Sequence, residues 1–101
     1  MSQRHPVTSL VSLAPGSGRA FTIAGRRIAL FNVAGTIHAI DDTCPHSGAP
    51  LSEGQLNGCV VTCPWHAIRF DVSSGRVPGQ TDKALSVYPV IVNGDQIEIE
   101  V

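Results

Sequence analysis

The sequence predicts an all-β protein built from antiparallel strands, and three observations support this fold class. Gly and Pro interrupt the chain at short intervals, with 10 and 7 copies among 101 residues. No long stretch repeats apolar residues with the 3.6-residue period of an amphipathic helix. The C-terminal segment QIEIEV alternates polar and apolar residues, as a strand with one buried face does. We therefore expect short strands joined by tight turns.

The two outer thirds of the chain hold the longer expected strands. They cover residues 7–13, 19–24, 26–33, 36–41, 84–92 and 96–101. Ala34-Gly35 lies between two of these segments, and Asn93-Gly94 lies between the last two. Asn-Gly favours the two-residue turn of a hairpin, because both residues tolerate positive φ. These segments predict a β framework built from the two outer thirds of the chain.

The middle of the chain, from about residue 41 to 79, has a different character. Only short strands are expected here, at 55–56, 59–62 and 68–72, and loops dominate. We expect this segment to form a small insert that carries the functional site. With 101 residues the whole chain, 1–101, is predicted to be a single domain.

Composition excludes several classes of partner. The net charge of −1 gives no reason to expect binding to nucleic acid or to an anionic membrane. No apolar run approaches the roughly 18 residues of a membrane span, and the N-terminal segment lacks the apolar core of a secretory signal. Three cysteines, an odd number, suit a reducing compartment better than a disulfide framework. We predict a soluble, cytoplasmic protein.

Two loops of the middle segment each hold one cysteine and one histidine. Cys44 and His46 form C-x-H, and after sixteen residues Cys63 and His66 form C-x2-H. Two thiolates and two imidazoles suit tetrahedral zinc, so a zinc-stabilised binding module is one interpretation. Zinc fingers, however, usually pair cysteine with cysteine and histidine with histidine. Mixed loops fit two metals better, with one bound by both thiolates and the other by both imidazoles.

The segments CPHSGAPLSEG and CPWHAIRFDVSSG resemble the two cluster-binding boxes of Rieske 2Fe–2S proteins. The resemblance implies the Rieske-type antiparallel β sandwich and one 2Fe–2S cluster. It also implies that Cys44 and Cys63 bind the inner iron, whereas His46 and His66 bind the outer iron. Replacing two thiolates by neutral imidazoles makes the oxidised centre less negative, so it accepts an electron more easily.

The chain departs from respiratory Rieske subunits at four positions. Ala49 and Trp65 occupy the places of two cysteines that form a disulfide in those subunits. Ile68 and Phe70 occupy the places of a serine and a tyrosine whose hydroxyls donate hydrogen bonds to sulfur. Because neither Ile68 nor Phe70 can donate, we expect a reduction potential near the low end of the Rieske range, about −150 mV.

By resemblance, the function is that of a ferredoxin of an oxygenase system rather than of an enzyme. Such a protein carries single electrons from a flavin-dependent reductase to a terminal oxygenase, such as a ring-hydroxylating dioxygenase. The alternative is the small Rieske subunit of an NADH-dependent nitrite reductase. The sequence contains no Gly-rich dinucleotide loop that would favour an independent oxidoreductase.

Four further residues are given simpler roles. Cys59 is predicted to lie in a strand as a buried or half-buried thiol. His5 and His38 are interpreted as solvated residues outside the site, His5 lying in a disordered start of the chain. Trp65 either packs against the loop around 50–51 or belongs to an exposed apolar rim for partner docking. The residues expected to form that rim with Trp65 are Pro45, Ala49, Pro50 and Ala67.

Overall fold

The computed structural model describes residues 3–65, 67–81 and 84–101, and this part of the chain consists of strands, loops and two short 3₁₀ helices. The elements are β1 Arg4–Ser9, η1 Leu10–Ser12, β2 Gly18–Ile23, β3 Arg26–Val33, β4 Thr36–Asp41, η2 Leu51–Glu53, β5 Gln55–Asn57, β6 Val60–Thr62, β7 Arg69–Asp71, β8 Val87–Tyr88, β9 Val90–Asn93 and β10 Gln96–Glu100. No helix in these ranges is long and apolar enough to cross a membrane.

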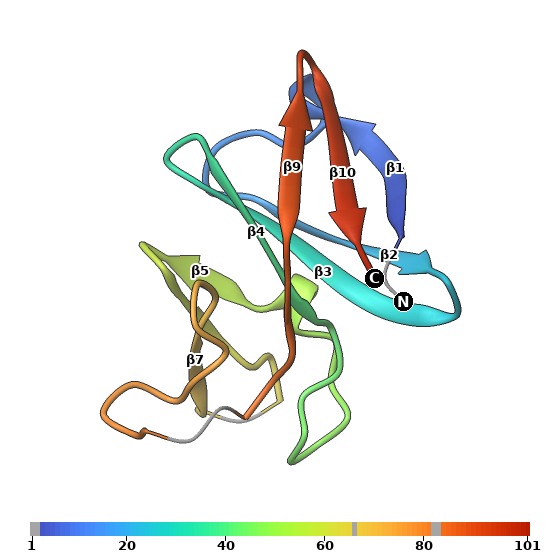
Figure 1. The fold of residues 1–101 in the computed structure, drawn as a ribbon. Coiled ribbons are helices and arrows are strands. Elements are labelled where there is room, and N and C mark those ends of the chain that lie inside the picture. Colours follow the sequence, from blue (N-terminus) through green and yellow to red (C-terminus); the bar gives the residue numbers. More distant parts are fainter. Residues whose placement is uncertain (1–2, 66, 82–83) are drawn as a thin grey trace.

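The strands of the described residues form three antiparallel sheets (Figure 1). The first has the order β1-β10-β9, the second β2-β3-β4-β8, and the third β5-β6-β7. Strands from the two ends of the chain build the first two sheets, whereas residues 55–71 supply the third. This arrangement confirms the predicted all-β framework with a small insert.

The β2-β3-β4-β8 sheet, which we call the middle sheet, is covered on both of its faces. Consequently β3 is buried without interruption from Ile28 to Asn32, instead of alternating between buried and exposed residues. One face contributes Ile28 and Leu30 to the sandwich core, whose buried members are Leu13, Ile23, Ile28, Leu30, Ile37, Ala39, Tyr88, Ile97 and Ile99. The opposite face contributes Ala29 and Phe31 to a second core. We call this second cluster the site core; its members are Ala29, Phe31, Ile40, Cys44, Ala49, Leu51, Val61, Cys63, Phe70, Val72 and Leu85.

The predictions for β3, β4 and the alternating last strand are confirmed. Strands β3 and β4 have the expected bounds, and Ile97 and Ile99 of β10 are fully buried. The described ends of the chain also pair, since Gln3 and Val101 exchange two backbone hydrogen bonds of 2.8 and 2.9 Å. His5, expected in a disordered start, lies in β1 opposite Ile99. That expectation was wrong, because strand pairing with β10 orders this segment.

Two other expected strands differ from the structure. The segment predicted at 7–13 leaves the sheet after Ser9 and turns through η1, which brings Leu13 into the sandwich core. The segment predicted at 84–92 is divided at Pro89, where the chain passes from the second sheet to the first. Proline has no N–H to continue a strand ladder, which makes it suitable for such a transition.

Two hairpin turns each include a glycine with positive φ, and in the first of them an alanine also has positive φ. Ala34 and Gly35, with φ of 51° and 96°, form the turn between β3 and β4. Two successive positive φ values match the twist of the strands that they join. Asn93 instead ends β9 opposite Gln96, so the turn predicted at Asn-Gly lies one residue later and begins at Gly94.

Candidate metal centre

Both cysteine–histidine loops are closed by the same kind of backbone hydrogen bond. The Cys44 N–H donates to the Ala49 carbonyl at 2.9 Å, and the Cys63 N–H donates to the Ile68 carbonyl at 2.9 Å. In each loop the bond joins the cysteine to the residue five positions later. The first loop has a further bond of 2.8 Å from the Gly48 N–H to the Cys44 carbonyl. Each cysteine is therefore fixed at the base of its loop, where the loop meets the fold.

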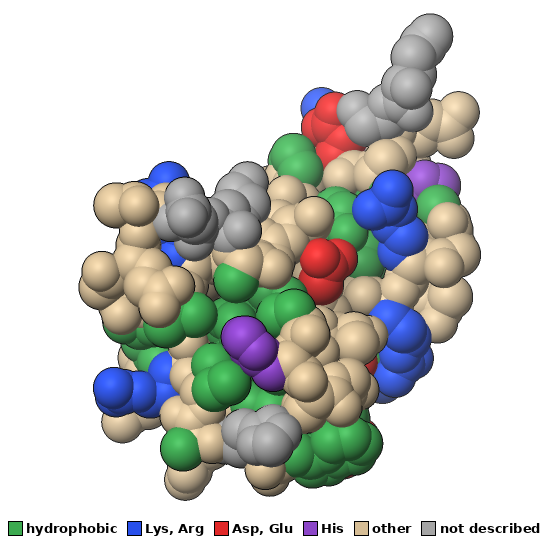
Figure 2. All heavy atoms as spheres, turned by 90° about the horizontal axis from the view of Figure 1, so that it is seen from below, with side chains coloured by type: hydrophobic (Ala, Val, Ile, Leu, Met, Phe, Trp, Pro, Cys, Tyr) green, Lys and Arg blue, Asp and Glu red, His purple; other side chains and the backbone are tan. Residues whose placement is uncertain are grey.

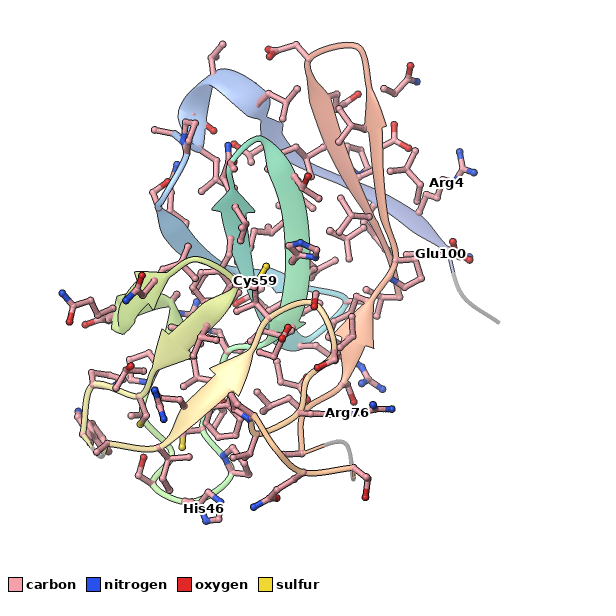
Figure 3. All side chains as sticks on the ribbon, turned by 90° about the vertical axis from the view of Figure 1, so that its left-hand side faces the viewer. Arg4, His46, Cys59, Arg76 and Glu100 are labelled. Carbon is pink, nitrogen blue, oxygen red and sulfur yellow. The ribbon has the colours of Figure 1, made fainter. Side chains whose placement is uncertain are left out.

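Burial separates the sulfur side chains from the imidazole. Cys44 and Cys63 are 1% and 3% exposed and belong to the site core. His46 is exposed and projects from the end of the molecule that carries the first loop (Figure 3). His66, the fourth predicted ligand, lies outside the described residues. Among the three predicted ligands that the structure describes, the sulfur side chains lie inside and the imidazole lies outside.

A contact between the loops holds the second cysteine close to the first loop. The Ser47 hydroxyl oxygen lies 3.5 Å from the Cys63 sulfur. The same oxygen accepts a hydrogen bond of 3.3 Å from the Ala49 N–H. Ser47 was not among the site residues predicted from the sequence. A hydroxyl immediately after the candidate ligand His46 is a signal that could have identified it.

The first loop is anchored to the middle sheet by a buried carboxylate. Asp42 is 2% exposed, and its carboxylate accepts a hydrogen bond of 2.8 Å from the Ser52 N–H. Its backbone carbonyl accepts a hydrogen bond of 2.6 Å from the Leu51 N–H. Arg27 of β3 lies 3.7 Å from the same carboxylate. These contacts hold the loop from both sides of Cys44.

A second carboxylate fixes the segment that leads into β8. The Tyr88 hydroxyl donates to Asp41 at 2.6 Å, and the Ser86 N–H donates to the other carboxylate oxygen at 3.0 Å. Burial, together with the hydrogen bond to Asp41, raises the pKa of the Tyr88 phenol above its ordinary value. The phenol therefore stays neutral and remains a donor at physiological pH.

The residues present suit a site with two kinds of ligand. Buried thiols on rigid loops can bind a soft metal as thiolates, and an exposed imidazole can bind a metal that faces the surface. Within residues 3–65, 67–81 and 84–101, no three His, Cys, Asp or Glu side chains form a compact metal-binding group. The predicted set includes His66, which falls outside these ranges.

Comparison with known proteins identifies the family. The family model of the Rieske [2Fe-2S] domain matches residues 3–89. The chain belongs to this family. The Rieske-type fold predicted from the two boxes is thus confirmed, and the cofactor of this Rieske domain is one Rieske-type 2Fe–2S cluster. This cofactor argues against the zinc-stabilised binding module considered above.

Relatives of this Rieske domain include electron-transfer proteins. The chain is 34% identical to the ferredoxin component of a naphthalene 1,2-dioxygenase system from Pseudomonas aeruginosa, with 91% of this chain and 89% of that protein covered. A structure of the complex of reduced oxygenase and oxidised ferredoxin in carbazole 1,9a-dioxygenase matches with a TM-score of 0.84 and 31% identity, covering 95% of this chain and 91% of the matched chain. A Mycobacterium tuberculosis protein classed as an NADH-dependent nitrite reductase small subunit matches with a TM-score of 0.89 and 25% identity, covering 100% and 96%.

Trp65 of the second loop is an exposed aromatic residue, two positions after Cys63. Its side chain is 64% exposed, which favours the predicted apolar rim over packing against the first loop. Pro45 and Ala67 are also exposed, and Pro50 is half-buried. Ala49 is fully buried, so its assignment to the rim was wrong, because its side chain packs in the site core. On the face of the molecule shown in Figure 2, hydrophobic side chains gather around a histidine.

Cys59 and His38 take no part in the loops. Cys59 is half-buried, as predicted, and is not in a disulfide, but it lies in the turn before β6 rather than in a strand. Figure 3 places it away from the end that carries His46. His38 is half-buried in β4, so its description as a solvated residue was only partly right.

Proposed function

We propose that this chain is a Rieske ferredoxin that carries single electrons from a flavin-dependent reductase to a terminal oxygenase. Cys44 and Cys63 bind one iron of the cluster, and His46 and His66 bind the other. All 101 residues form one domain, in which about 41–79 is the cluster-binding part. The oxygenase is of the ring-hydroxylating dioxygenase class, and the protein works in the cytoplasm.

One observation carries this proposal: in the two loops the cysteine side chains are buried, whereas the described imidazole is exposed. Cys44 and Cys63 reach into the site core, and His46 is exposed. When bound, a Rieske-type cluster takes up and releases one electron at a time. The buried cysteines shield one side of the site, whereas the exposed imidazole offers a short path to a docked protein. Such a site transfers electrons without transforming a substrate of its own.

The relatives support a ferredoxin rather than a catalytic subunit. The Pseudomonas aeruginosa protein is a ferredoxin component of a dioxygenase system, and the alignment covers nearly all of both chains. The carbazole dioxygenase structure contains a ferredoxin together with its oxygenase. Pro45 in the first loop and Trp65 and Ala67 in the second are exposed apolar residues, which suit a small, short-lived interface of this kind.

Reconstitution tests the function directly. The purified protein should be brown, bleach on reduction, and support oxygenase turnover only when a flavin reductase and NADH are present. A protein that binds a cluster but never reduces an oxygenase would contradict the proposed role.

Ligand assignment requires a separate set of variants. His46→Ala and His66→Ala should lose cluster iron, because each removes a metal ligand. His38→Ala, a half-buried histidine of β4, is the matched control and should retain it. Full iron content with unchanged magnetic resonance in His46→Ala would refute the assignment.

The second candidate function is the small subunit of an NADH-dependent nitrite reductase. It is favoured by the M. tuberculosis structure, whose TM-score of 0.89 exceeds the 0.84 of the carbazole dioxygenase match. The higher sequence identity of the ferredoxin match, 31% against 25%, favours the first candidate. We give sequence more weight, because the fold is common to both classes. Electron transfer only within a complex with a nitrite reductase large subunit would reverse this choice.

A further inference from the structure

Ser47 connects the two loops through a single hydroxyl group. Its oxygen is 3.5 Å from the Cys63 sulfur and accepts a hydrogen bond of 3.3 Å from the Ala49 N–H. Ser47 is half-buried, and Cys63 is 3% exposed. Competition from bulk water for this contact is therefore limited. The hydroxyl belongs to the first loop, whereas the sulfur belongs to the second.

The hydrogen-bonding capacity of the groups fixes which one donates. A serine hydroxyl has one proton and two lone pairs. The Ala49 N–H already occupies one lone pair of Ser47, which leaves the hydroxyl proton for another acceptor. Cys63 as a metal ligand is a thiolate and has no proton to give. The Ser47 hydroxyl is therefore the donor, and the Cys63 sulfur is the acceptor.

We propose that Ser47 is a positioning residue that raises the reduction potential of the site through its hydrogen bond to the Cys63 sulfur. This inference rests on the proposed ligand role of Cys63. A donor at a ligand sulfur stabilises negative charge, and that charge is larger in the reduced state. The side chains of Ile68 and Phe70 cannot donate, but Ser47 supplies a hydroxyl from the opposite loop.

The principal test is the midpoint potential of Ser47→Ala beside that of the wild type. Loss of the hydroxyl should lower the equilibrium constant for reduction about tenfold, which corresponds to about 59 mV for a one-electron couple. Ser73→Ala is the control, because it removes a hydroxyl that bonds to Asp71 outside the two loops. It should leave the potential unchanged.

A second pair of variants separates the hydroxyl from the shape of the side chain. Ser47→Thr keeps the hydroxyl, and Ser47→Val introduces a side chain of nearly the same shape as threonine but without the hydroxyl. The threonine variant should retain the wild-type potential, and the valine variant should show the tenfold loss. Cluster content, read from iron analysis and visible absorption, is measured in every sample.

The outcomes distinguish this inference from the function on which it rests. Equal potentials for Ser47→Thr and Ser47→Val, in samples with full cluster content, would overturn the hydrogen-bond assignment and leave the ferredoxin function intact. A wild-type protein that binds no cluster would overturn both. A lower potential confined to Ser47→Ala and Ser47→Val would support the inference.

Discussion

Leu51 provides a test of the claim that the loops depend on their own core. It follows the first loop directly, is fully buried, and packs in the site core with Cys44 and Cys63. Leu51→Ala removes the equivalent of about three methylene groups, or roughly 2.4 kcal/mol of transfer free energy at about 0.8 kcal/mol each. The residual cavity adds to this, and measured Leu→Ala costs are about 2–5 kcal/mol. We expect a loss of about 3 kcal/mol.

Urea unfolding followed by circular dichroism measures the change, and visible absorption measures cluster retention. With a slope of about 1.5 kcal/mol/M, the midpoint should fall by roughly 2 M. Leu13→Ala is the matched control, because Leu13 is also fully buried but lies in the sandwich core. Both variants should lose similar stability, whereas only Leu51→Ala should lose the cluster faster than the wild type. Equal rates of cluster loss would refute the separation of the two cores.

Three further substitutions test other parts of the structure. Tyr88→Phe removes the hydrogen bond to Asp41 and should cost about 1–2 kcal/mol. The folded state raises the pKa of this phenol, so the stability cost of Tyr88→Phe should be constant below about pH 10 and should shrink as the pH rises through the folded pKa. Urea titrations at several pH values measure this cost. A stability difference that stays constant with pH would contradict the pKa argument. Gly54→Ala would bring its Cβ into a clash with the Thr62 carbonyl oxygen, so the free energy of unfolding should fall by about 1–3 kcal/mol. Thermal unfolding measures this change, and an unchanged melting temperature would show that the backbone shifts to remove the clash. Trp65→Ala should leave stability and cluster content unchanged but slow the reduction of the oxygenase in stopped-flow mixing, and an unaltered rate would remove Trp65 from the docking surface.

The presence of a Rieske-type cluster could be predicted from the sequence, because the two boxes are defined by residue type and spacing. The structure has two buried cysteines and an exposed histidine at the positions of these boxes, and the same type of backbone hydrogen bond closes both loops. The contact between Ser47 and Cys63 could not be predicted in the same way. It joins residues sixteen positions apart, and it exists because the fold brings the two loops together.

The limits of the strands show a similar division between local and long-range causes. Strand β4 follows from local alternation and a glycine turn, so its bounds were correct. Strand β1 ends at Ser9, and the chain then turns so that Leu13 is buried in the sandwich core among residues that are far away in the sequence. Likewise, Pro89 marks a change of sheet that only the pairing of β8 with β4 and of β9 with β10 reveals.

The pairing of Gln3 with Val101 has a practical consequence for engineering. Both described ends emerge side by side from the β1-β10-β9 sheet, not from the loops that hold Cys44 and Cys63 (Figure 1). A fluorescent label or an affinity handle attached at either described end would lie at this sheet and leave the two cysteine–histidine loops uncovered. The same geometry suits immobilisation on an electrode through one terminus, with His46 directed toward the solution.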